Sequence, residues 1–243
     1  MSRAKHTLGA LAVLLVASVW LGGCPMSPPP AARSGGERIT GRDFLLPGQA
    51  ESTTPEPYGL YSYLLFSAEP SEASRPPHLE AIRAYLRMLP PVQGLEQEGA
   101  PRRTLNVTYL PVTDQRAVAA VESRDPQAPE VVLRHYGYAR AKILLAKVPG
   151  GPHLGGPYLV SYRQPLGAVE QVSGEYGWVD MSAVPAARID RWLRIFVKET
   201  AQRDYWDRAT TVRAWTSILD ELDKAGEGAP QILRAVVFWV QGG

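Results

Sequence analysis

The chain has 243 residues and a nearly balanced charge, with 26 Lys and Arg residues against 24 Asp and Glu. This balance excludes the strongly basic class of nucleic-acid-binding domains, and a single cysteine excludes an internal disulfide or a zinc site built from several cysteines. Stability must therefore come from the burial of apolar side chains, which make up 45% of the residues.

The N-terminal residues follow the order of an export signal. A basic start with Arg3 and Lys5 precedes an apolar run over residues 8–21 and two glycines before Cys24. This run is shorter than the roughly 20 residues that a membrane-spanning helix needs, and glycines and a proline follow it. We therefore expect a signal peptide over residues 1–23.

The residues around Cys24 resemble the lipobox of bacterial lipoproteins, in which a branched apolar residue and two small residues precede an invariant cysteine. Here these residues are Leu21, Gly22 and Gly23. The resemblance implies that a diacylglycerol is joined to the sulfur of Cys24, that the chain is cut before it, and that the new amine is acylated. Three acyl chains would make an effectively permanent membrane anchor. The alternative is an ordinary secretory signal with a chance cysteine.

The same resemblance implies a place in the bacterial cell envelope. Loss of a signal that contains Arg3 and Lys5 would leave 24 basic and 24 acidic side chains, so we expect no nucleic-acid partner. Pro25 stands where lipoproteins retained at the inner membrane of enteric bacteria carry an aspartate. We therefore expect the periplasm-facing outer membrane, with the inner membrane as the alternative.

Residues 24–57 are rich in Pro, Gly and Ser, and we interpret them as the lipidated cysteine followed by a tether. A flexible coil of this length averages about 30–35 Å from end to end. The apolar residues 44–46 interrupt the polar composition, and we interpret them as a short strand or a clip on the domain edge. Residues 58–243 then form a single domain with a sizeable core.

Strands and helices alternate in the first half of this domain. Residues 60–66 are aromatic and apolar, which is typical of a buried strand. Apolar residues at helical spacing from 79 to 89 predict a helix with Pro76 or Pro77 in its first turn and its end before Pro90, and alternation predicts a strand over 104–110. Residues 125–148 are predicted to be mostly helical, with Gly137 as a candidate break.

A further strand is predicted over residues 157–162, followed by a hairpin with Ser173 and Gly174 at its turn and Val169 opposite Trp178. Apolar stripes then predict a helical C-terminal third. The pattern indicates an α+β fold, with a small sheet of about three to five strands packed by helices. The predicted C-terminal helices are 189–200, 212–222 and 230–240.

Residues 149–180 offer the side chains of an envelope hydrolase. His153, in a glycine-rich loop, could act as base, Ser161 or Ser173 as nucleophile, and Asp180 or Glu175 as the orienting carboxylate. No Gly-x-Ser-x-Gly elbow is present, and any chain with several histidines offers such combinations. We therefore assign no catalytic residue and keep the hydrolase as the alternative function.

Other patterns do not define a site. His78, His135 and His153 share no metal-binding spacing, so we expect no metal and no cofactor. Residues 203–208 mix aromatic and charged side chains, which suits a corner between helices and leaves an envelope protein partner open. The sequence thus favours a lipid-anchored envelope protein with a non-catalytic accessory or binding domain.

Overall fold

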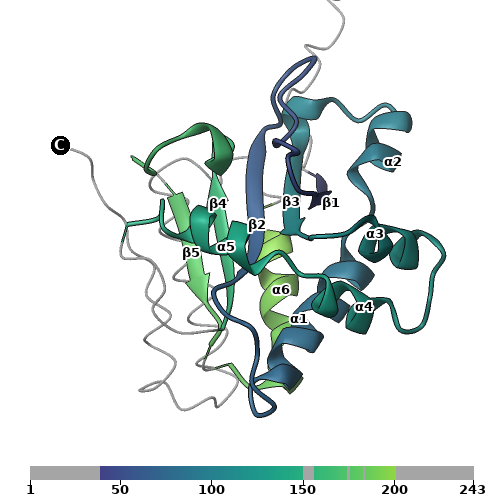
Figure 1. Cartoon of the computed structure of the whole chain (residues 1–243). Coiled ribbons are helices and arrows are strands. Elements are labelled where there is room, and N and C mark those ends of the chain that lie inside the picture. The colour runs from purple at the N-terminus through teal and green to yellow at the C-terminus, as the bar shows by residue number, and fades with distance from the viewer. Residues whose placement is uncertain (1–38, 150–155, 174–175, 183, 201–243) are drawn as a thin grey trace, which may run out of the picture. The chain divides into compact units, whose positions relative to one another are not determined.

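The computed structural model describes residues 39–149, 156–173, 176–182 and 184–200 (Figure 1). These residues form a five-stranded mixed sheet in the order β1-β3-β2-β4-β5, with helices on both of its faces. The fold class is α+β, as predicted.

Three neighbouring strands of the sheet run parallel. β3 lies between β1 and β2 and is parallel to both, whereas β4 is antiparallel to β2 and β5 is antiparallel to β4. Every residue of β2, β3 and β4 is buried, which explains why these segments are mostly apolar along their whole length. The strands are β1 (Ile39–Leu45), β2 (Leu60–Phe66), β3 (Leu105–Pro111), β4 (Pro157–Tyr162) and β5 (Tyr176–Asp180).

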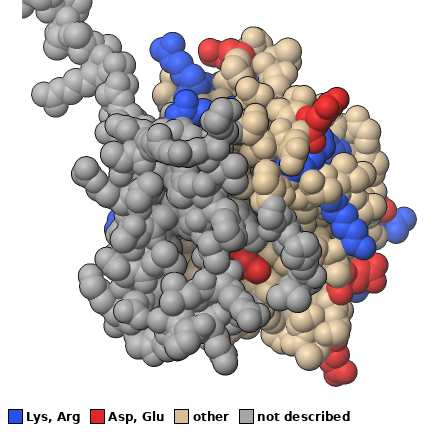
Figure 2. Space-filling model, turned by 90° about the vertical axis from the view of Figure 1, so that its left-hand side faces the viewer, with Lys and Arg blue, Asp and Glu red and all other residues tan. Residues whose placement is uncertain are grey.

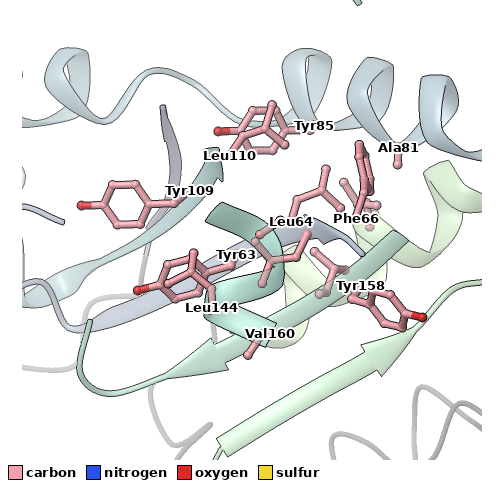
Figure 3. Packing of buried hydrophobic residues seen from close by; sticks show 14 of the residues in the cluster. Tyr63, Leu64, Phe66, Ala81, Tyr85, Tyr109, Leu110, Leu144, Tyr158 and Val160 are labelled. Atoms are coloured by element: carbon pink, nitrogen blue, oxygen red, sulfur yellow. The ribbon is translucent and has the colours of Figure 1, made fainter. Parts of the chain in front are cut away.

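Helices cover the two faces of the sheet differently. α1 packs against α4 and α6 on one face, and α5 packs against β2 and β3 on the other. Figure 3 shows Ala81 of α1 beside Phe66 and Leu144 of α5 beside Tyr63, and side chains three residues apart on a strand point to opposite faces. The helices are α1 (Arg75–Met88), α2 (Val92–Gln97), α3 (Gln115–Glu122), α4 (Ala128–Arg134), α5 (Tyr138–Leu145) and α6 (Ala186–Thr200).

Several predicted elements are confirmed. The strands predicted from residues 60, 104 and 157 are β2, β3 and β4, and two predicted helices are α1 and α6. The long helical stretch is divided at Gly137 into α4 and α5. A Cβ at Gly137 would lie only 3.2 Å from Cβ of Pro111, so glycine lets the chain pass close to the end of β3. The helices predicted over 212–222 and 230–240 lie outside the described residues.

The prediction that the tether extends to residue 57 is wrong. Residues 39–45 form β1, and Glu51 is buried, so the folded region begins by Ile39 and not at Tyr58. The polar residues of β1 have structural partners, because Arg42 donates hydrogen bonds to the carbonyls of Leu86 and Leu89 at the end of α1. A cation at a helix C-terminus is favourable, so a charged strand residue is stabilising here.

The hairpin predicted over residues 169–179 is also wrong. β5 pairs with β4, which places Val160 and not Val169 opposite Trp178, and residues 169–173 form no strand. Other bonds hold that segment: Val172 donates its N–H to the carbonyl of Lys147 at 2.9 Å, and Tyr162 donates its hydroxyl to the carbonyl of Ser173 at 2.9 Å.

Tyrosines form the part of the core beneath α5 (Figure 3). The rings of Tyr61 and Tyr109 are stacked with centroids 6.4 Å apart, and those of Tyr63 and Tyr109 are 5.8 Å apart. Burial raises the pKa of all three phenols, which keeps them protonated. The Tyr63 hydroxyl donates to the buried carboxylate of Glu51 at 3.1 Å, so this core is fastened to the segment that precedes β2.

No helix within the described ranges is both long enough and apolar enough to cross a lipid bilayer.

Candidate functional site

Ser161, the candidate nucleophile, lies in the middle of β4 and is fully buried. Its Oγ is 2.8 Å from Oγ of Ser62 on β2, and Oγ of Ser62 also donates to Oδ1 of Asn106 on β3 at 2.8 Å. Nδ2 of Asn106 then donates to Oγ1 of Thr40 on β1 at 3.4 Å. A row of buried polar side chains thus crosses four strands, and Ser161 satisfies its hydrogen bonding within it.

Asp180, the candidate carboxylate, lies on the other face of the sheet. It is paired with Tyr158, whereas Ser161 is paired with Gly177, so the two side chains alternate to opposite faces. Oδ1 of Asp180 accepts hydrogen bonds from the N–H of Ser182 at 2.8 Å and from its hydroxyl. The structure therefore does not bring Ser161 and Asp180 together, and His153 and Glu175 lie outside the described residues.

The two histidines among the described residues, His78 and His135, make local contacts. His78 is buried with its ring 4.6 Å from that of Phe66, and its Nδ1 is 2.7 Å from the carbonyl oxygen of Ser74. Nδ1 of His135 is 4.0 Å from Oδ2 of Asp114. Within the described ranges, no three His, Cys, Asp or Glu side chains are grouped so that they could hold a metal ion.

A hollow of about 490 Å³ borders the outer edge of β1. Three N–H groups along this edge are bonded: Arg42 donates to the carbonyl of Pro90, Phe44 donates to Oδ1 of Asp43, and Leu46, just after the strand, donates to Oε1 of Gln49. Burial raises the pKa of Asp43. Such bonds protect a sheet edge from pairing with another chain, so the polar backbone groups of β1 at this hollow are largely used by the fold itself.

A second hollow, of about 460 Å³, lies at the carboxyl ends of β2 and β3, and we call it the β2–β3 crevice. The chain leaves β2 toward α1, and the connection after β3 passes through α3 and α4, which packs against α1, before it reaches α5 on the other face of the sheet. The crevice lies where these two connections begin. The crevice is lined by Glu69, Pro70, Arg75, Thr113, Leu133, Arg134, Tyr136 and Tyr138.

Backbone bonds fix the walls of the crevice. Thr113, just after β3, donates its N–H to the carbonyl of His135 at 2.7 Å, and Gly137 donates its N–H to the carbonyl of Pro111 at 3.0 Å. The Tyr136 hydroxyl accepts the N–H of Phe66 at 2.9 Å and donates to the carbonyl of Leu64 at 3.3 Å. The junction of α4 and α5 is therefore tied to the ends of both strands.

The charged groups of the crevice are less constrained. Arg75, Arg134 and Glu69 are exposed, and within the described part of the chain none of them forms an ion pair. Burial, and then the Glu69 carboxylate, raises the pKa of Tyr138 to about 12 against the opposing effect of Arg75. The Tyr138 phenol is thus a neutral hydrogen-bond donor at physiological pH.

Basic and acidic side chains elsewhere on the described surface are interspersed. On the described part of one face, Figure 2 shows side chains of both signs interspersed. That part offers no extended positive surface for a long polyanion to follow. The crevice is better suited in size to a small molecule, since such sites enclose about 300–1,000 Å³.

The sequence did not single out Arg75, Arg134, Glu69 or Tyr138. Their positions in the chain could have indicated them, because Glu69 comes shortly after β2 and Thr113 comes shortly after β3. It becomes informative only once β2 and β3 are known to be parallel neighbours.

Comparison of the chain with models of protein families, with curated proteins and with solved structures found no match.

Proposed function

We propose that this protein is a lipid-anchored component of the bacterial cell envelope whose domain binds a small molecule in the β2–β3 crevice and does not catalyse a reaction. The lipid on Cys24 would hold the domain at a membrane, in keeping with the lipobox-like residues that precede this cysteine. The domain would then act as an accessory or binding module in the envelope.

The binding proposal rests on the charged side chains that line the crevice. Arginine and glutamate side chains without ion-pair partners among the described residues line a hollow of about 460 Å³ at the carboxyl ends of two parallel strands. Polar groups that the fold leaves without partners, gathered in a concave site with aromatic walls, are what a small-molecule site requires.

The alternative function is an envelope hydrolase that uses residues of the 149–180 region. The burial of Ser161 in a hydrogen-bonded row and the position of Asp180 on the opposite face weigh against it. A hydrolase would need a base within about 2.6–3.2 Å of an accessible nucleophile.

Retention of small molecules by the full chain tests the proposal. The detergent-purified protein is incubated with the small-molecule fraction of a bacterial envelope extract, washed, and examined by mass spectrometry after denaturation. We expect at least one compound to be retained by the wild type and lost from Thr113→Trp, because Thr113 is exposed and lines the crevice. Gln97→Trp, at the exposed end of α2, is the matched control and should retain it.

Two results would overturn the proposal. Retention of no compound, or equal retention by Thr113→Trp, would remove the crevice as a binding site. Conversion of an extract compound by the wild type, lost from both His153→Ala and Ser161→Ala, would establish the hydrolase instead.

A further inference from the structure

We propose that the ligand of the β2–β3 crevice is a zwitterion, a small molecule that carries both an acid group and an amine, such as an amino acid or the end of a short peptide. This inference rests on the proposed binding function. It adds the charge pattern and the shape of what is bound.

The charge pattern follows from three side chains. Arg75 and Arg134 both line the crevice, and a pair of guanidinium groups suits a carboxylate, which accepts several parallel N–H donors. Glu69 lies at the same hollow and would repel a simple anion. A ligand with an amine near its acid group satisfies Glu69 as well as the two arginines.

The fold itself does not neutralise these charges. Neither arginine lies within 4 Å of a carboxylate among the described residues, although Glu69 shares their cavity. Two other exposed arginines are paired: Arg83 reaches Glu130 at 2.9 Å, and Arg194 reaches Asp190 at 2.7 Å. The two crevice arginines therefore keep their donors available for a ligand.

Recognition must come from side chains because the nearby backbone offers few donors. α1 begins at the crevice with Arg75, but Pro76 and Pro77 have no N–H, so its first turn supplies little hydrogen bonding to an anion. Thr113 and Tyr138 add hydroxyl groups to the lining, and no hydroxyl partner of Tyr138 occurs among the described residues. The guanidinium groups are thus the principal donors.

The aromatic side chains that line the crevice, Tyr136 and Tyr138, indicate which kind of ligand side chain would fit. The rings of Tyr136 and Tyr138 meet edge to face, with centroids 4.8 Å apart and planes at 61°, and Leu133 lines the same hollow. Tyr136 and Leu133 are almost fully buried and Tyr138 is half-buried, so an apolar side chain of the ligand would contact mainly Tyr138. Aromatic pairs favour offset or edge contacts.

The test uses L-phenylalanine and two blocked analogues as probes in calorimetric titrations of the full chain in detergent. N-acetyl-L-phenylalanine lacks the ammonium group and L-phenylalaninamide lacks the carboxylate. We expect L-phenylalanine to bind most tightly, and each analogue to bind about tenfold or more weakly, because each leaves a charged group of the crevice without its partner.

Substitutions test which residue of the crevice recognises each charged group of the ligand. Arg75→Gln and Arg134→Gln should each reduce the preference for a free carboxylate, and Glu69→Gln should reduce the preference for a free amine. The matched controls are Arg103→Gln and Glu98→Gln, which change exposed residues that do not line the crevice and should leave all three affinities unchanged.

The outcomes separate this inference from the proposed function. Binding of N-acetyl-L-phenylalanine as tight as that of L-phenylalanine, and sensitive to Arg134→Gln, would overturn the zwitterion and leave a binding crevice for anions. Failure of all three probes would overturn it too, and the binding function would stand only if an extract compound is still lost from Thr113→Trp. L-Phenylalanine binding that none of the three substitutions alters would place the ligand elsewhere and contradict the inference.

Discussion

Replacement of Glu51 by alanine should destabilise the domain, although this residue lies in a segment whose composition is that of a linker. The Glu51 side chain is 2% exposed, and its Oε1 accepts hydrogen bonds from the Tyr63 hydroxyl at 3.1 Å and the N–H of Gly167 at 2.9 Å. Its Oε2 is 3.9 Å from the guanidinium of Arg140. One carboxylate thus joins the segment before β2 to the sheet and to the turn after β4.

The magnitude follows from the donors that lose their acceptor. A buried donor left without a partner costs about 1–3 kcal/mol, and the N–H of Gly167 is partly exposed and can recover a water molecule, so the total is about 3 kcal/mol. For a domain of this size that corresponds to a fall of about 6–12 °C in Tm. Thermal unfolding of the full chain in detergent, followed by far-ultraviolet circular dichroism, measures it.

Two comparisons make this result specific. Glu56→Ala, an exposed glutamate of the same segment, should change stability by less than about 0.5 kcal/mol. Gly167→Ala should destabilise the wild type, because its Cβ would collide with Oε2 of Glu51, but it should cost little in the Glu51→Ala background. Equal Tm values for Glu51→Ala and Glu56→Ala, or additive effects of Glu51→Ala and Gly167→Ala, would rule out this structural role of the Glu51 carboxylate.

Three further predictions follow from other parts of the chain. Cys24→Ala should abolish incorporation of labelled fatty acid, whereas equal labelling of the variant would exclude Cys24 as the lipid site. Ser161→Ala should lower the free energy of unfolding, measured by urea titration, by about 1 kcal/mol, because Oγ of Ser62 loses a buried partner. No change would show that the Ser161 hydroxyl does not stabilise the fold. Hydrogen bonds and ion pairing with Arg194 and Arg87 lower the pKa of Asp190, so its small contribution, below about 1 kcal/mol, is present at neutral pH and lost as the pH falls through the lowered pKa. The Tm of Asp190→Asn should therefore lie below that of the wild type at pH 7 and converge with it in acid, and a constant difference would contradict the assignment.

The strands and helices with strong periodic patterns could be predicted from the sequence. β2 is buried on both faces and appears as an apolar run, β3 alternates between apolar and polar residues, and α6 has an apolar stripe that packs against α1. α3 was missed because it is short, although Asp114 caps it by accepting the N–H of Arg116 at 2.8 Å.

The predictions of the tether and of the hairpin were wrong because the local sequence does not show which distant residues or strands a segment will contact. Arg42 bonds to α1 more than 40 residues away, and Glu51 bonds to Gly167 across 116 residues, so β1 and the segment after it have the composition of a tether. β5 pairs with β4 in preference to the nearer segment, because register is decided by the whole sheet and not by one turn.

The candidate site could not be predicted for a related reason. Its residues come from four separate stretches that meet only because β2 and β3 are parallel neighbours. Ser161, in contrast, was a candidate because serine is a common nucleophile. The structure buries it on β4, where it belongs to a hydrogen-bonded row of side chains.

Hydrogen–deuterium exchange of the full chain, measured by mass spectrometry with and without the small-molecule fraction of an envelope extract, tests the binding crevice most directly. The segments that surround it are residues 67–75, 112–114 and 133–138. We expect slower exchange in these segments when ligand is present, because bound ligand stabilises the backbone around its site. Unchanged exchange there, together with protection confined to residues 157–162 and 176–182 around Ser161 and Asp180, would contradict it.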